Sequence, residues 1–187
     1  MPKRMFDLIL SSCLIPIFLL PMCLIALAIK VTSRGPTIHW SKRIGKNNKV
    51  FLMPKFRTMV IETPQVATHL IQSPHSFLTP IGGFLRKSSM DELPQILSVW
   101  KGDMSFVGPR PALFNQQDLI ELRTFFSIQQ LRPGVTGWAQ INGRDELPIP
   151  IKVEYDRFYK ENLSFALDLK ILIATLFKVF RADGVTH

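Results

Sequence analysis

The sequence predicts a mostly helical α+β protein, with a re-entrant membrane helix and its exit turn in residues 1–34 and a small cytosolic domain in residues 35–187. Three observations predict this architecture. An uncharged apolar stretch lies near the N-terminus, segments with helical apolar spacing follow it, and two short strand-like segments flank a turn. The residues after the apolar stretch are enough for one domain.

The apolar stretch between Asp7 and Lys30 contains no charged side chain and is interrupted by Pro16 and Pro21. As a helix rising about 1.5 Å per residue, it is just long enough to cross a hydrocarbon layer of about 30 Å. Cations flank it on both sides, and basic flanks tend to stay in the cytoplasm. A helix that enters the bilayer, bends at a proline and returns satisfies both flanks, so we expect a re-entrant helix at a cytoplasmic membrane face.

Two alternatives remain for this stretch. A signal peptide would have Lys3 and Arg4 before its apolar core, but no small-residue cleavage site follows, because Ile25–Ile29 still lies inside the apolar run. A single-span anchor is the stronger alternative, since a membrane helix tolerates an interior proline. Two prolines five residues apart favour the bend.

The protein is basic, with a formal net charge of +9. Such a charge suits nucleic acid, acidic lipid headgroups or a polyanionic small substrate. Zinc-finger spacing and basic-region heptads are absent from the sequence, so no nucleic-acid partner is expected, and the cations beside the apolar stretch suit membrane lipids. Cys13 and Cys23 lie inside that stretch, which favours packing over a disulfide or a metal site.

The remaining segments predict short strands and amphipathic helices. Residues 60–77 are expected to form a loop with at most one short helix, and Gly82 and Gly83 disfavour a helix around them. The last helix is apolar nearly all round but carries Lys170 and Lys178, so it either lies in the headgroup plane or is a core helix. The expected strands are Thr37–Trp40 and Val50–Met53, and the expected helices are Ser89–Lys101, Leu113–Gln130, Ile151–Tyr159 and Ser164–Arg181, with Ser89 and Ser164 as candidate N-caps.

The adjacent acids Asp91 and Glu92 are the candidate catalytic pair. With Ser89 as the N-cap, Glu92 closes a capping box; with Asp91 as the cap, Pro94 falls in the first turn. Either way, both acids sit at a helix N-terminus, where the helix dipole favours their ionised forms. An ionised aspartate is a nucleophile toward phosphorus, and a neighbouring glutamate can hold Mg²⁺ or move a proton. The simpler interpretation is a pair of ordinary helix-start acids.

Cationic side chains accompany the acid pair. Arg110 lies between two prolines, and its planar guanidinium suits a phosphate. A glycine-rich loop, Arg132–Arg144, offers backbone N–H groups to a ligand, and its Trp138 suits either base stacking or core packing. Together these features predict a diphosphate site. The candidate phosphate ligands are Lys55, Arg57, Arg86, Arg110 and Arg144.

The chain resembles the bacterial sugar transferases, small monotopic phosphoglycosyl transferases, over nearly its whole length. The segments that carry the resemblance are Lys3-Arg4-Met5-Phe6-Asp7, Lys55-Phe56-Arg57-Thr58-Met59, Asp91-Glu92-Leu93-Pro94-Gln95, Gly102 through Pro111, Arg132 through Arg144, and Leu167-Asp168-Leu169-Lys170.

This resemblance implies transfer of a phospho-sugar from a UDP-sugar to polyprenyl phosphate, usually undecaprenyl phosphate, at the cytoplasmic face of the bacterial inner membrane. UMP and a polyprenyl diphosphate-linked sugar are the implied products, and Mg²⁺ is the implied cofactor. By the same resemblance Asp91 is the nucleophile that forms an aspartyl phospho-sugar. The resemblance also implies that Glu92 and Asp91 together hold Mg²⁺. It implies phosphate binding by Lys55, Arg86 and Arg110, and a place near the site for Asp156.

The chain departs from the family pattern at two positions. Leu20-Pro21 stands where the family commonly has Ser-Pro, so the hydroxyl that can satisfy a carbonyl at the bend is absent there, and Leu163 stands where a Trp is frequent. The alternative function is that of a non-catalytic membrane-anchored module that binds acidic lipids or diphosphate-linked intermediates. The residues assign neither the sugar nor an oligomeric state.

Overall fold

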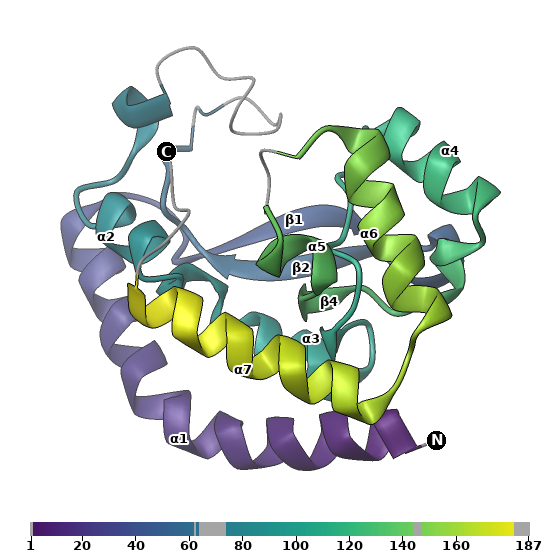
Figure 1. Ribbon diagram of the computed structural model, residues 1–187. Coiled ribbons are helices and arrows are strands. Elements are labelled where there is room, and N and C mark those ends of the chain that lie inside the picture. Colours follow the sequence, from purple (N-terminus) through teal and green to yellow (C-terminus); the bar gives the residue numbers. More distant parts are fainter. Residues whose placement is uncertain (1, 62, 64–73, 144–146, 182–187) are drawn as a thin grey trace.

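The computed structural model describes residues 2–61, 63, 74–143 and 147–181, and over these the chain is mostly helical with a few short strands, as predicted. Figure 1 shows two small sheets at the centre, the long helix α1 curving around one side, and α7 crossing the front. The elements in chain order are α1 (Pro2–Thr32), β1 (Ile38–Ile44), the 3₁₀ turn η1 (Lys46–Asn48), β2 (Val50–Phe56), η3 (Pro74–Phe77), α2 (Gly82–Lys87), η4 (Met90–Glu92), α3 (Gln95–Lys101), β3 (Ser105–Val107), α4 (Gln117–Phe125), η5 (Ile128–Gln130), β4 (Gly134–Thr136), α5 (Trp138–Ile141), α6 (Ile149–Glu161) and α7 (Phe165–Arg181).

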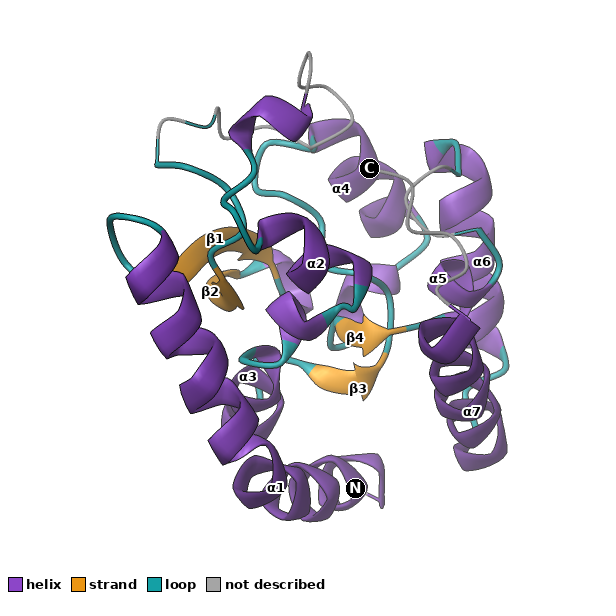
Figure 2. Ribbon diagram, turned by 90° about the vertical axis from the view of Figure 1, so that its left-hand side faces the viewer, coloured by secondary structure: helices purple, strands orange, loops and turns teal. Residues whose placement is uncertain are grey.

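Helix α1 is bent, and the bend turns its two halves around the domain (Figures 1 and 2). Pro16 and Pro21 lie inside it, and proline is the usual cause of a sharp helix kink. The helix is long and apolar enough to cross a membrane, yet only 6% of its most apolar window is buried in the protein. Its side chains are therefore available to lipid along most of its length.

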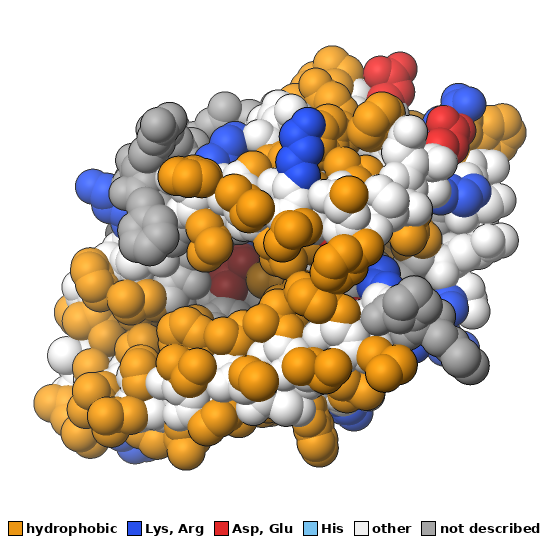
Figure 3. Space-filling model, turned by 60° about the horizontal axis from the view of Figure 1, so that its bottom comes forward, with side chains coloured by type: hydrophobic (Ala, Val, Ile, Leu, Met, Phe, Trp, Pro, Cys, Tyr) orange, Lys and Arg blue, Asp and Glu red, His pale blue; other side chains and the backbone are white. Residues whose placement is uncertain are grey.

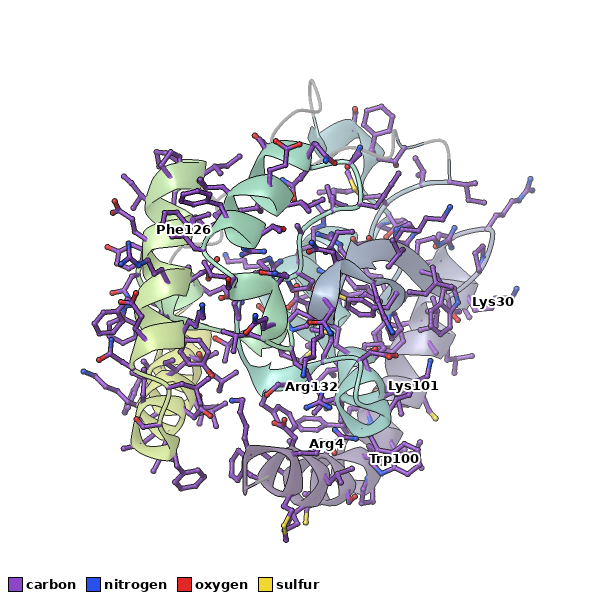
Figure 4. All side chains as sticks on the ribbon, turned by 90° about the vertical axis from the view of Figure 1, so that its right-hand side faces the viewer. Arg4, Lys30, Trp100, Lys101, Phe126 and Arg132 are labelled. Atoms are coloured by element: carbon purple, nitrogen blue, oxygen red, sulfur yellow. The ribbon has the colours of Figure 1, made fainter. Side chains whose placement is uncertain are left out.

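Polar contacts attach the beginning of α1 to the domain. The Lys3 ammonium pairs with Asp168 in the first turn of α7, and the Tyr159 hydroxyl donates to the same carboxylate at 2.6 Å. The Arg4 guanidinium donates to two carbonyls in the last turn of α3, at 2.6 and 2.7 Å (Figure 4). Asp7, which is 2% exposed, accepts from the backbone N–H of Phe106 at 3.1 Å.

The end of α1 is attached to the same domain by packing and by a buried arginine. Ile29 is completely buried in a cluster with Phe56 and Leu85. Arg57, which follows β2, donates to the carbonyl and the hydroxyl of Ser33 just after the helix. A straight helix of 31 residues would extend about 45 Å, and the bend instead lets α1 follow the surface of the domain that both its ends contact.

The strands β1 and β2 form an antiparallel hairpin that is longer than predicted, with Ile38 opposite Phe56 and Ile44 opposite Val50. The prediction ended the second strand before Pro54, since proline disfavours a strand interior. A two-stranded sheet has open edges on both sides, so the missing N–H of Pro54 need not interrupt the ladder to β1.

The strands β3 and β4 form a short parallel pair, and β4 lies inside the segment predicted as a glycine-rich loop. The chains approach so closely that a Cβ on Gly134 would lie 2.1 Å from the backbone nitrogen of Gly108. Only glycine allows this approach. The pair fixes the segment that follows β3, which carries Arg110.

Two predicted helices are shorter than expected, and two are confirmed. Residues 113–130 form α4 and η5, separated at Ser127, whose positive φ of 56° interrupts the helix. The helices α6 and α7 occupy their predicted positions, and the backbone N–H of Leu167 donates to the hydroxyl of Ser164 at 3.2 Å, which confirms this N-cap.

Helix α7 combines the two alternatives considered for it. Ile171 is completely buried in the main core, while Ile173, Leu176 and Phe177 are 47–63% exposed. Figure 3 shows apolar side chains gathered across this side of the molecule, with a hollow between them that contains acidic side chains. A helix that packs one face on the core and exposes another apolar face suits a position at a membrane surface.

Candidate active site

Two elements and the segment after β3 bring charged side chains together at the predicted acid pair. Asp91 and Glu92 lie on η4, Lys55 on β2, and Arg110 follows β3. Lys55 Nζ lies 2.6 Å from Glu92 Oε1, and Arg110 Nη2 lies 3.1 Å from the same oxygen. The structure therefore unites residues that are separated by up to 55 positions in the chain.

Glu92 is held as a carboxylate by these two cations. Burial alone would raise its pKa, but the charges and hydrogen bonds of Lys55 and Arg110 outweigh burial and lower the pKa below its ordinary value. Both cations use Oε1, so the second carboxylate oxygen is left for another ligand. Glu92 thus combines a fixed position with a permanent negative charge.

Asp91 has the opposite electrostatic balance. Only 7% of the residue is exposed, and burial raises its pKa to about 6, reinforced by the charge of Glu92 and opposed by Lys55, Arg86 and Arg110. A buried carboxylate beside a second one is costly to ionise, which makes it a better base and nucleophile once ionised. Two neighbouring acids with divergent pKa values are typical of a catalytic pair.

Arg86 approaches the pair from α2. Its Nε donates to the Thr58 hydroxyl at 3.0 Å, and burial lowers the pKa of Arg86 while the charge of Asp91 opposes that shift. Arginine remains protonated despite such a shift. The Thr58 contact therefore fixes a guanidinium close to Asp91.

The local backbone differs from the predicted capping box. Ser89 has a positive φ of 57° and makes no side-chain cap, and α3 begins only after Pro94. The capping prediction was wrong because Glu92 turns toward Lys55 and Arg110 instead of back to Ser89. The left-handed conformation at Ser89 separates α2 from η4 and directs both acids into the group of cations.

Not every predicted ligand lies in this group. Arg57 is buried at the end of α1, where it donates to Ser33, and Asp156 is paired with Arg123. Arg144 lies outside the described residues. Trp138 stacks on Phe158, with ring centroids 5.2 Å apart, so its observed role is packing.

Arg123 is a residue that the sequence analysis missed. It is 7% exposed and donates to the carbonyl of Arg110 at 2.8 Å. Its position gave one signal: it lies four residues after Leu119, hence on the same helical face as a core residue. An arginine on the apolar face of a helix indicates a buried partner, which is Asp156.

The acid pair fits a magnesium ion that the substrate helps to bind. Among the described residues, no group of three or more His, Cys, Asp or Glu side chains is placed to hold a metal. The free oxygen of Glu92 and the carboxylate of Asp91 supply hard oxygen donors. Mg²⁺ commonly binds one or two carboxylates and takes its other ligands from substrate phosphates and water.

Comparison with known proteins identifies the family. The family model described as "Bacterial sugar transferase" matches residues 1–182. UDP-glucose:undecaprenyl-phosphate glucose-1-phosphate transferase of Escherichia coli (strain K12) is 39% identical over 186 residues, which cover 95% of this chain and 40% of that protein. The uncharacterized sugar transferase EpsL of Bacillus subtilis (strain 168) is 41% identical over 189 residues, 98% of this chain and 89% of EpsL.

A third relative carries a different sugar in its name. UDP-N-acetylgalactosamine-undecaprenyl-phosphate N-acetylgalactosaminephosphotransferase of Aeromonas hydrophila is 35% identical over 187 residues, 97% of this chain and 44% of that protein. The chain thus spans less than half of two of these relatives and most of the third. With the match along nearly its whole length, the chain belongs to the bacterial sugar transferase family.

Proposed function

We propose that this protein transfers a phospho-sugar from a UDP-sugar to polyprenyl phosphate, with undecaprenyl phosphate as the acceptor in bacteria. The observation that carries the proposal is the acid pair: a buried Asp91 beside a Glu92 held ionised by Lys55 and Arg110. The names of the Escherichia coli and Aeromonas relatives support the same donor and acceptor classes. The products are UMP and a polyprenyl diphosphate-linked sugar.

The reaction proceeds in two displacements at one phosphorus atom. An ionised oxygen of Asp91 attacks the sugar-bearing phosphorus, the bond from that phosphorus to the bridging oxygen breaks, and UMP leaves with the electron pair. The aspartyl phospho-sugar remains. A phosphate oxygen of polyprenyl phosphate then attacks the same phosphorus, and the Asp91 carboxylate is released.

The cations and Glu92 make these displacements feasible. A carboxylate approaching a diphosphate is repelled unless the phosphate charge is neutralised, and Lys55, Arg86 and Arg110 supply fixed positive charge there. Glu92 with Asp91 would hold Mg²⁺, which would supply further neutralisation of the diphosphate charge. Burial of Asp91 keeps water away from the acyl phosphate.

We also propose that α1 is re-entrant, with both ends at the cytoplasmic face of the inner membrane. Support comes from the contacts of both helix ends with one domain, from the bend at the prolines, and from the basic flanks. The exposed apolar faces of α1 and α7 would then lie in lipid. A lipid-borne phosphate could reach the acid pair without leaving the membrane surface.

The covalent step is tested without the lipid acceptor. Radiolabelled UMP is incubated with a UDP-sugar panel and Mg²⁺, and label entering the UDP-sugar reports reversible formation of the aspartyl phospho-sugar. We expect exchange with the wild type, none with Asp91→Asn, and normal exchange with Asp118→Asn, an exposed acid at the start of α4. Exchange that persists in Asp91→Asn would exclude Asp91 as the nucleophile.

The complete reaction separates the enzyme from a binding module. With polyprenyl phosphate added, the wild type should release UMP continuously, and a chelator should stop the release. Binding of UDP-sugar and lipid phosphate without UMP formation would instead favour the non-catalytic module.

A further inference from the structure

The segment that carries Arg110 is held through its carbonyl groups. Pro109 and Pro111 flank Arg110 and have no N–H, so they cannot donate hydrogen bonds that would fix the backbone there. Instead, three consecutive carbonyls each accept a hydrogen bond. The donors are Gly134 N to Pro109 O at 2.9 Å, Arg123 Nη1 to Arg110 O at 2.8 Å, and Arg43 Nη1 to Pro111 O at 3.2 Å.

The central donor, Arg123, is itself fixed by a buried acid. Its Nε and Nη2 lie 3.0 and 2.6 Å from one oxygen of Asp156 on α6. The two residues are 7% and 1% exposed. Neutralisation of each charge by the other makes their burial tolerable, and the three nitrogens of one guanidinium are shared between Asp156 and the Arg110 carbonyl.

These contacts form a single path to the acid pair. Asp156 contacts Arg123, Arg123 contacts the backbone of Arg110, and the side chain of Arg110 contacts Glu92 at 3.1 Å. A displacement of the Arg110 backbone would move its guanidinium away from Glu92. Small misplacements of a charged group at a reacting centre cost large factors in rate.

We propose that Arg123 and Asp156 are positioning residues, which act on the reaction only by fixing the Arg110 guanidinium beside Glu92. The proposal rests on the proposed function, since it takes Arg110 as a ligand of the diphosphate. It gives an indirect role to Asp156, which the family resemblance placed near the site.

A double-mutant cycle tests this path. UMP release is measured for wild type, Arg123→Gln, Arg110→Ala and the double variant, as kcat and KM for the UDP-sugar. Arg123→Gln alone should lower kcat/KM about tenfold or more, but should have less than about a twofold further effect in the Arg110→Ala background. An equal factor in both backgrounds would show that Arg123 acts independently of Arg110 and overturn the proposal.

A matched control variant comes from the same helix as Asp156. Arg157 on α6 pairs with Glu161 at 2.7 Å, and both side chains are more than half exposed. Arg157→Gln removes an arginine–carboxylate pair of the same type and should leave kcat/KM unchanged.

A second replacement separates positioning from folding. Arg123→Met combined with Asp156→Leu exchanges the buried pair for apolar side chains of similar size, a change that often preserves stability. The variant should unfold at the wild-type temperature or above, yet lose activity to the same extent as Arg123→Gln. Wild-type kcat/KM in this folded variant would also overturn the proposal. Arg123→Lys keeps the positive charge but loses the planar guanidinium, so its kcat/KM should lie between those of the wild type and Arg123→Gln.

Hydrogen exchange provides a readout that does not depend on catalysis. The Gly134 amide donates to the carbonyl of Pro109 in the same segment. It should exchange faster in Arg123→Gln and in Arg123→Met with Asp156→Leu, and at the wild-type rate in Arg157→Gln. An unchanged exchange rate would contradict the proposal that Arg123 fixes the backbone of this segment. If the wild type released no UMP while Gly134 responded as expected, the proposed function would fail and the positioning contacts would stand.

Discussion

Asp91, the proposed nucleophile, illustrates how a buried acid opposes the stability of the fold. Its pKa is about 6 in the folded chain, compared with an ordinary value of 3.8. The folded state therefore prefers the protonated acid, and this preference stabilises the protein fully below pH 3.8 and is lost as the pH rises through 6. At neutral pH the chain carries a buried charge that folding disfavours, as expected at a functional site.

Replacement of this acid should therefore stabilise the protein. With a chelator present at pH 7.5, Asp91→Asn should unfold at a higher temperature than wild type. Its free energy of unfolding should be larger by up to about 3 kcal/mol, which corresponds to a shift of about two pKa units. The difference should disappear below pH 4, where both side chains are neutral. Thermal unfolding in detergent or nanodiscs measures it, and a lower melting temperature for Asp91→Asn at pH 7.5 would contradict the electrostatic balance described here.

Glu92 should determine the response to magnesium. Glu92→Gln keeps the shape of the side chain but removes the charge, so the Mg²⁺ concentration for half-maximal UMP release should rise about tenfold or more. Titration of activity with Mg²⁺ measures this. An unchanged titration curve would place the metal ligands elsewhere.

At this scale the sequence indicated which charged residues come together better than it indicated their individual contacts. Asp91 and Glu92 attracted attention as adjacent acids with cations nearby, and Lys55, Arg86 and Arg110 do surround them. Asp156 and Arg123 are 33 residues apart on different helices, so only the packing of α4 on α6 reveals their pairing. The positive φ of Ser89 was also unpredictable, because serine usually caps a helix at such a position.

Helix α1 is the element whose shape was expected from composition. The two prolines and the basic flanks predicted a bend, and the bend is present. The missing serine before Pro21 is not replaced by Ser11, whose hydroxyl donates to the carbonyls of Asp7 and Leu8, well before the prolines. The bend therefore depends on the prolines and on the contacts at both helix ends.

Removal of both prolines should straighten α1. In Pro16→Leu combined with Pro21→Leu, the helix hydrogen bonds that proline prevents can form, and the beginning of the helix can no longer reach α3 and α7. A tag at the N-terminus should then become accessible from outside the inner membrane, and activity should fall about tenfold or more. Leu19→Ile with Leu24→Ile, which changes two exposed apolar residues, serves as the control. A cytoplasmic tag in the proline-free variant would show that the prolines do not set the topology.

The proposed catalytic group belongs to a molecule with one extended apolar side. The side formed by α1 and α7 exposes apolar residues, whereas α4 lies on the far side from the first half of α1 (Figure 1). Anchoring at such a surface orients the entire domain. This orientation follows from the apolar faces, which the sequence predicted. The position of the acid pair relative to the membrane surface follows instead from the tertiary arrangement.

The two native cysteines measure this orientation. Cys13 and Cys23 are both exposed on α1, so protein atoms do not shield them. In membranes, a charged maleimide should label neither, and after solubilisation in SDS it should label both, because lipid is the only barrier. As a control, the Cys introduced by Asp118→Cys on α4 should react with the same maleimide in open vesicles. Labelling of Cys13 or Cys23 in intact membranes would contradict a helix embedded in lipid.

The ion pair between Lys3 and Asp168 has a consequence for the order in which the protein is assembled. The two residues are 165 positions apart, so the ribosome must synthesise the chain as far as Asp168 before Lys3 can find this partner. Contacts of such long range form late, after the costly closure of a large loop. The first turn of α1 therefore docks on α7 only after Asp168 has been made, whereas its contacts with Val99 and Phe106 can form earlier.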